Sequence, residues 1–134
     1  MAFVLHPRID EDTILIGNLG LSRVLLMNNK HFPWVILVPR IADAVELTEL
    51  SDADYSTVTT EIRHVAQAMQ KLYQPIKMNI AALGNQVRQL HIHIVARFES
   101  DVAWPNPIWG AASEAYADAE ASHKITELQR ALFE

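Results

Sequence analysis

The segment QLHIHIVAR, residues 89–97, places two histidines two positions apart within a run of apolar residues. This alternation is typical of a β-strand, in which successive side chains point to opposite faces. One predicted face is a core of Leu90, Ile92, Ile94 and Ala96. The opposite face is predicted to carry a row of Gln89, His91, His93 and Val95. Neighbours in this row lie about 7 Å apart, two strand rises of about 3.3 Å, so both imidazoles can reach one ligand.

The residue types leave three interpretations of this row open. The first is a solvated sheet face that carries histidine without a function. The second is a metal site, because His-x-His on a strand can place two imidazoles on one ion, with His31, Glu99 or Asp101 as a third ligand. The third is nucleophilic attack on phosphorus, because imidazole has an ordinary pKa of about 6.5 and is largely neutral near pH 7. Spacing does not choose between the metal and the nucleophile.

The histidine strand is the last of five that the sequence predicts. The other four are TILIGNL (13–19), SRVLLMN (22–28), PWVILVP (33–39) and KMNIAAL (77–83), and the histidine strand itself is expected over 87–98. Short connections, such as the turn at Gly20, favour antiparallel pairing. We therefore predict an α+β domain built on a five-stranded antiparallel sheet.

Two amphipathic helices complete the prediction. A helical turn is expected over 43–50, and a helix of about 22 residues begins at Ser51, with Asp54 in a capping-box position, and stops before Pro75. Its apolar stripe is Tyr55, Val58, Ile62, Val65, Met69 and Leu72. A second stripe predicts a C-terminal helix: Ala117, Ala121, Ile125, Leu128 and Leu132. We assign residues 1–110 to the domain proper and 111–134 to a C-terminal helical extension of it.

Composition narrows the classes of partner. The 134 residues suit one domain, and a formal net charge of −5 argues against a duplex nucleic-acid binder, which needs a broad basic face. A mononucleotide remains compatible, since its phosphate needs only local donors. The absence of cysteine excludes disulfides, thiolate zinc sites and cysteine nucleophiles. The N-terminus lacks a signal-peptide pattern and no apolar run approaches about 18 residues, so we expect a cytoplasmic protein without a membrane span.

The histidine row and its flanks resemble the histidine triad (HIT) superfamily of nucleotide hydrolases and transferases. The family signature is His-φ-His-φ-His-φ-φ, with φ apolar, and QLHIHIV (89–95) matches it with glutamine in the first position. Further resemblance lies in MNNKHFPWVILVPR (27–40), LTELSDAD (47–54) and NIAALGNQV (79–87), so that it covers roughly residues 14–98. The segment AWPNPIWG (103–110) is similar to bacterial members.

The resemblance implies roles for the two histidines. The middle histidine of the family is the nucleophile, which places that role on His91, and the third contacts the phosphate and leaving group, which maps to His93. Two departures accompany this match. Gln89 stands in place of the first histidine and cannot titrate, and Val35 stands where many members carry a further histidine.

Substrate-binding residues follow from the same resemblance. Asn28 matches the residue that holds the ribose hydroxyls, and Asn79 matches a phosphate-contacting residue. Asn85 and Gln86 match the polar residues after the turn glycine, and Gln89 keeps its place in the row. Arg40, Arg88 and Arg97 either add positive charge near a phosphate or are solvated ends of strands. Trp104 and Trp109 form either a wall of a nucleobase pocket or an aromatic plug packed on the sheet or on a partner subunit.

The resemblance therefore implies a hydrolase of nucleoside phosphate anhydrides or phosphoramidates, such as dinucleoside polyphosphates. The expected intermediate is a nucleotidyl group on His91, with no cofactor and no fixed metal ligand. The family also implies a homodimer in which two sheets join edge to edge. Two alternatives stay open: a nucleotide-binding module with little or no catalysis, and a metal-dependent hydrolase that uses His91 and His93 as ligands.

Overall fold

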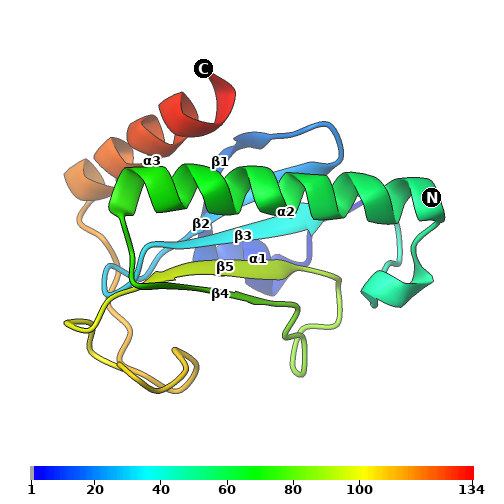
Figure 1. Cartoon of the computed structure of the whole chain (residues 1–134). Helices are drawn as coiled ribbons and strands as arrows, with labels where there is room; N and C mark the ends of the chain where they lie inside the picture. The colour runs from blue at the N-terminus through cyan, green and yellow to red at the C-terminus, as the bar shows by residue number, and fades with distance from the viewer. Residues whose placement is uncertain (1) are drawn as a thin grey trace.

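A five-stranded antiparallel sheet forms the centre of the computed structural model, which describes residues 2–134 (Figure 1). The strand order is β1-β2-β3-β5-β4. The strands are β1 Thr13–Asn18, β2 Ser22–Met27, β3 Trp34–Pro39, β4 Lys77–Ala81 and β5 Ile92–Arg97. The helices are α1 Pro7–Asp12, the 3₁₀ turn η1 Leu47–Glu49, α2 Asp52–Tyr73 and α3 Asp118–Phe133. The predicted α+β fold is confirmed, and no helix within residues 2–134 is both long and apolar enough to cross a bilayer.

The long helix α2 begins and ends where its sequence predicts. The Ser51 hydroxyl accepts a hydrogen bond of 3.1 Å from the backbone N–H of Asp54, which satisfies one of the free donors of the first turn. Asp52 and Asp54 also place negative charge at the positive end of the helix dipole. At the other end Gln74 takes a left-handed conformation, with φ of 52°, and Pro75 prevents continuation.

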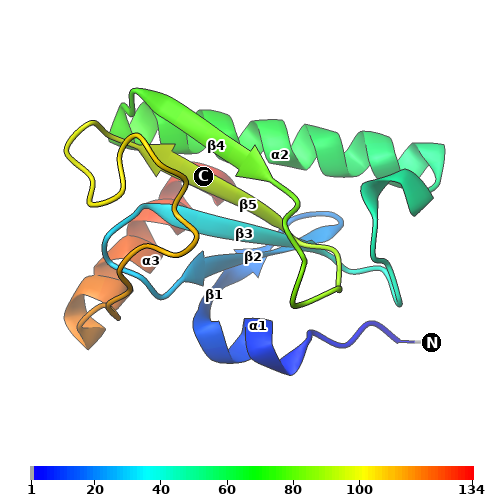
Figure 2. The ribbon, with the colours of Figure 1, turned by 90° about the horizontal axis from the view of Figure 1, so that it is seen from below.

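The sheet separates two apolar layers. Helices α2 and α3 cover one face, whereas α1 and the segment 98–111 lie on the other (Figure 2). The face beneath α2 receives the predicted core residues of the histidine segment, namely Leu90, Ile92, Ile94 and Ala96. The opposite face receives Val95 together with Trp34 and Ile36 of β3. The predicted alternation of the histidine strand is therefore correct for its two faces.

The histidine strand is shorter than predicted. The expected strand over 87–98 is wrong at its beginning, because β5 starts at Ile92. Its neighbour β4 ends at Ala81, opposite His93, so the residues before Ile92 have no partner strand on that side. The backbone N–H of Leu90 donates instead to the carbonyl of Ala44, at 2.9 Å. Residues 82–91 thus form a loop that delivers His91 to the sheet.

Helix α1 is an element that is not among those predicted from the sequence. Pro7 occupies its first turn, and the His6 ring accepts a hydrogen bond of 3.1 Å from the backbone N–H of Arg8 through Nδ1. Proline is favoured at this position because its fixed φ suits a helix and its missing donor is not needed there. Ile9 is buried in the apolar layer that also contains Trp34, so α1 packs on the face of the sheet that carries the histidines.

Candidate active site

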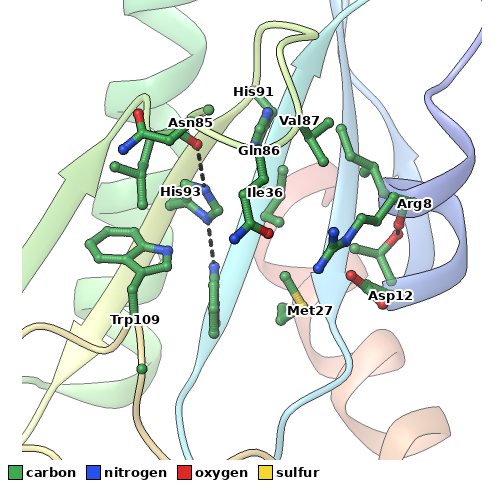
Figure 3. Close-up of a pocket in the computed structure, with 16 residues that line it drawn as sticks. Arg8, Asp12, Met27, Ile36, Asn85, Gln86, Val87, His91, His93 and Trp109 are labelled. Carbon is green, nitrogen blue, oxygen red and sulfur yellow. Dashed lines mark hydrogen bonds between the residues drawn. The ribbon is translucent and has the colours of Figure 1, made fainter.

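A cavity of about 400 Å³ opens on the face of the sheet opposite α2 (Figure 3). That volume lies within the range of small-molecule sites. The residues that line it come from α1, the ends of β1 and β2, strand β3, the loop 83–87, and the segment around Trp109. His91 and His93 both line it, and their rings meet edge to face with centroids 4.8 Å apart. The cavity therefore joins the predicted histidine pair to several other parts of the chain.

The hydrogen bond of His91 fixes which of its nitrogens is reactive. Its Nδ1 lies 2.6 Å from the carbonyl oxygen of Gln89. A carbonyl oxygen only accepts, so Nδ1 carries the hydrogen and donates it. The lone pair of the neutral ring is then on Nε2, on a side chain only 7 % exposed. This is the tautomer that a nucleophilic histidine needs.

The two hydrogen bonds of His93 fix the opposite tautomer. The Trp34 indole, which can only donate, gives a 3.0 Å hydrogen bond to Nδ1 of His93. Nε2 of His93 in turn donates to the carbonyl of Leu83, at 3.2 Å. Both interactions appear as dashed lines in Figure 3. With one accepting and one donating nitrogen, the ring is held neutral.

The pKa of His93 agrees with this geometry. Burial lowers the pKa, the neighbouring His91 lowers it further, and the Leu83 carbonyl opposes both, with a resulting pKa of about 4. The folded pKa thus lies below the ordinary value of about 6.5, so the unfolded chain takes up this proton first as pH falls. The contribution of His93 to stability is complete above about pH 6.5 and is lost as the pH falls through about 4.

Replacing Trp34 with phenylalanine is expected to raise the pKa of His93 from about 4. The substitution removes a donor that bonds only the neutral ring, while burial remains and keeps the pKa below about 6.5. An NMR titration of the histidine Cε1–H signals measures the change. Trp104→Phe is the control, because Trp104 does not line the cavity. An unchanged pKa in Trp34→Phe would show that the indole does not hold the tautomer.

The donor set does not fit the metal interpretation of the pair. Both ring nitrogens of His93 already have partners, so coordination would break its bond to Trp34 or to Leu83. Within residues 2–134 no group of three or more histidine or acidic side chains is placed to hold a metal ion. Asp101, one of the third ligands considered, instead accepts hydrogen bonds from Arg97.

Trp109 closes the cavity beside His93. Its ring meets the His93 ring edge to face at a centroid distance of 5.2 Å and that of Trp34 at 6.5 Å. Such edge-to-face pairs are favoured by the charge distribution of aromatic rings. Trp104 lies elsewhere, with the guanidinium carbon of Arg97 5.6 Å from the centre of its ring. Of the two tryptophans in this segment, only Trp109 lines the cavity.

Arg97 anchors the segment that carries Trp109. Its guanidinium donates to both carboxylate oxygens of Asp101, to the side-chain oxygen of Asn79 and to the carbonyl of Asn106. The side chains of Arg97 and Asp101 are only 2 % and 4 % exposed. Arg97 is therefore neither a solvated strand end nor a phosphate contact, because its donors are used within the fold.

Two polar residues of the loop 83–87 lie in the same cavity as the histidines. Asn85 and Gln86 both line the cavity, and Figure 3 shows the Gln86 amide extending across it. Asn28 lines a second cavity of about 360 Å³, which shares Trp34 and Trp109 with the first. Its side-chain oxygen accepts a 3.0 Å hydrogen bond from the backbone N–H of Tyr116. The two cavities thus meet at the tryptophans.

Comparison with known proteins identifies the family of this chain. The model of the HIT domain family matches residues 8–100. The chain belongs to the histidine triad family. A histidine triad protein from Bradyrhizobium japonicum has 44% identity and a TM-score of 0.96, over 99% of this chain and 100% of that one. One from Sinorhizobium meliloti has 42% identity and a TM-score of 0.94, over 97% of both chains.

A third solved structure, a histidine triad protein from Marinobacter aquaeolei, has 39% identity and a TM-score of 0.96, over 98% of this chain and 97% of that one. The search of curated proteins found no match. Proteins of the HIT family generally bind or hydrolyse nucleotides, so the cavity of this HIT domain is its candidate nucleotide site.

Gln89 departs from the row that the sequence predicts. Its side chain does not line the cavity with His91 and His93; it donates to the carbonyl of Val4 and accepts from the backbone N–H of His6, each at 2.8 Å. The row is interrupted because residues 82–91 are a loop and strand alternation does not apply there. Only the backbone carbonyl of Gln89 contacts the triad, through Nδ1 of His91.

The structure places Asn79 and Val35 of this HIT domain away from the histidine pair. Asn79 lies on β4 and bonds Arg97 through its side chain, and it lines neither of the two cavities. Val35 points into the core beneath α2, on the face of the sheet away from the histidines. The residue of β3 that contacts the triad is instead Trp34, one position earlier. Val35 is therefore not the position of a missing catalytic histidine.

Two charged residues of α1 that line the cavity, Arg8 and Asp12, are not among the site residues that the sequence predicts. Pro7 followed by acidic residues is a helix-start signal that would have predicted α1. Its position beside the histidines depends on packing of Ile9 against the sheet, for which the local sequence carries no signal.

Proposed function

We propose that this HIT protein is a nucleotide hydrolase in which His91 attacks the α-phosphorus of a nucleoside phosphate anhydride or phosphoramidate. The observation that carries the proposal is the tautomer of His91: Nδ1–H is bound to the Gln89 carbonyl, which leaves the Nε2 lone pair available on a ring that lines the cavity. A neutral imidazole oriented in this way is a competent nucleophile near pH 7.

The reaction proceeds in two displacements. Nε2 of His91 forms a bond to the α-phosphorus, and the bond from phosphorus to the leaving oxygen or nitrogen breaks with its electron pair on the leaving group. The ring then carries positive charge, which the Nδ1–H bond to the Gln89 carbonyl stabilises. Water next attacks the phosphorus, the P–N bond returns its electrons to Nε2, and the water proton passes to solvent. The products are a nucleoside monophosphate and the free leaving group.

Donors around the cavity stabilise charge on the phosphoryl oxygens in this proposal. The side-chain amides of Asn85 and Gln86 line the cavity and are exposed, so they are available to a ligand. Nε2–H of His93 is 3.2 Å from the Leu83 carbonyl, at the long end of the hydrogen-bond range, and can turn to a phosphoryl oxygen. Asn28, at the adjoining cavity, is the residue proposed for the ribose hydroxyls.

A labelling experiment tests the function. The protein is incubated with diadenosine tetraphosphate labelled in the α-phosphate, with and without a chelator, and is quenched at high pH. A label that is stable to base, labile to acid and located on the peptide that contains His91 is the expected result, because a phosphorus–nitrogen bond has this stability. Labelling of another peptide, or dependence on a metal that the chelator removes, would contradict the mechanism.

A nucleotide-binding module without turnover is the second candidate. It is favoured by His93, whose two ring nitrogens are bonded to Trp34 and Leu83, so that a phosphoryl oxygen has to displace the Leu83 carbonyl before His93 can bind it. Binding of the nucleotide without label or product in the same experiment would support this candidate over the hydrolase.

The proposal includes a homodimer. Strand β4 is at an edge of the sheet, where Ile80 is 48 % exposed and Ile76, the residue just before the strand, is 55 % exposed. Pairing of two such edges would cover apolar surface and satisfy unpaired backbone groups. Sedimentation equilibrium at a mass near the 15.1 kDa of one chain would contradict it.

A further inference from the structure

One cationic and one anionic side chain line the cavity, and both come from α1. Arg8 is the one lysine or arginine among the residues that line it, and Asp12 is the one carboxylate. Among residues 2–134 Arg8 makes no ion pair, and its side chain is exposed. Figure 3 shows Arg8 and Asp12 on α1, across the cavity from Trp109. A free guanidinium in this place is suited to bind phosphate, to which it can donate two parallel hydrogen bonds.

The side chain of Gln89 holds the chain just before Arg8. Its Nε2 donates to the carbonyl of Val4 and its Oε1 accepts from the backbone N–H of His6, each at 2.8 Å. The side-chain amide of Gln89 thus bonds backbone groups of residues 4 and 6, which lie more than 80 positions earlier in the sequence. His6 is also the N-cap of α1, so this clamp fixes the point at which the chain enters the helix.

We propose that Arg8 binds the phosphate groups beyond the phosphorus that His91 attacks, and that Gln89 is the positioning residue that holds Arg8 at the cavity. The inference rests on the proposed function and adds the residues by which this site would prefer a nucleotide with two or more linked phosphates. It also gives a physical reason for glutamine at position 89. An amide carries a donor and an acceptor at every pH, whereas an imidazole loses its acceptor when it is protonated.

Steady-state kinetics of two substrates test the role of Arg8. Arg8→Gln is expected to raise KM for diadenosine tetraphosphate about tenfold, the usual size of one charge-assisted hydrogen bond, with a much smaller change in kcat. An adenosine phosphoramidate with a neutral amine leaving group has no further phosphate and should keep its KM. Arg8→Lys should restore part of the loss, and Arg63→Gln, an exposed arginine of α2 outside the cavity, is the matched control. Equal losses for both substrates would overturn the assignment.

Gln89→Ala tests the positioning role. It should raise KM for diadenosine tetraphosphate in the same direction as Arg8→Gln but by a smaller factor, and it should leave KM for the phosphoramidate unchanged. Because Gln89 acts through Arg8, the double variant should be no worse than Arg8→Gln alone. Gln89→Glu keeps the acceptor for His6 and loses the donor to Val4, so an intermediate KM is expected. Additive effects in the double variant would overturn the link.

A binding measurement separates this inference from the hydrolase proposal. Calorimetry with AMP and with ATP needs no turnover, and the wild-type protein should bind ATP more tightly, with the preference reduced about tenfold in Arg8→Gln. If the wild type forms no product but binds ATP more tightly than AMP, and Arg8→Gln loses this preference, only the hydrolase proposal fails. If both proteins bind AMP and ATP equally well, the Arg8 assignment fails even where hydrolysis is observed.

Discussion

Replacing His91 with alanine is expected to lower kcat for nucleotide hydrolysis by at least about 10³-fold, the scale on which loss of a covalent nucleophile is felt. The reason is geometric. The other imidazole in the cavity, His93, has its Nδ1 lone pair bonded to Trp34 and its Nε2 hydrogen bonded to Leu83, so it offers no free lone pair to phosphorus. Release of labelled nucleoside monophosphate over time measures the rate.

Controls separate chemistry from folding in this test. His123→Ala removes an exposed imidazole from α3, outside the cavity, and should retain full activity. His91→Asn keeps a donor for the Gln89 carbonyl while removing the nucleophile, so it should fold as the wild type does and remain inactive. Both His91 variants should still bind nucleotide. A His91→Ala protein with more than about a tenth of the wild-type kcat would exclude covalent catalysis at this residue.

The sequence predicts the two faces of the histidine strand because alternation is a local property of extended backbone. Ile92 and Ile94 lie beneath α2, and His93 and Val95 lie on the other face, as their parity requires. The beginning of the strand is not local: it depends on β4 ending at Ala81, so the expected start at residue 87 is wrong. For the same reason the predicted row breaks between Gln89 and His91, and the Gln89 side chain lies outside the cavity.

The parts of the site that the sequence does not predict depend on contacts between distant segments. Gln89 reaches backbone atoms more than 80 positions away, and nothing in the heptad indicates their approach. Trp34 has the apolar pattern of a core residue, and only the pairing of β3 with β5 brings its indole to His93, 59 positions later. Arg97 looks like a charged strand end until Asp101 folds back on it.

Replacing Asp101 with alanine is expected to destabilise the fold by about 3–5 kcal/mol, the usual cost of breaking a buried ion pair from one side. At this chain length that corresponds to a loss of roughly 10–20 °C in Tm, measured by thermal unfolding followed with circular dichroism. The carboxylate also accepts from the backbone N–H groups of Phe98, Ala103 and Trp104. The substitution therefore leaves the Arg97 guanidinium without its counter-charge and three N–H groups without their acceptor.

Two comparisons decide whether loss of the Arg97–Asp101 pair causes the destabilisation expected for Asp101→Ala. Glu99→Ala removes the same charge from an exposed position two residues away and should change Tm by only a few degrees. Burial raises the pKa of Asp101, but the Arg97 guanidinium and the backbone donors outweigh it and lower the pKa to about 2. The stability from this group is therefore complete above about pH 4 and is lost as the pH falls through about 2, so Asp101→Asn should flatten that part of the acid-unfolding curve. The same pair anchors the segment that places Trp109 beside His93, so Asp101→Ala should also raise the fluorescence-detected mobility of Trp109. Equal Tm values for the Asp101→Ala and Glu99→Ala variants would show that the anchor does not stabilise the fold.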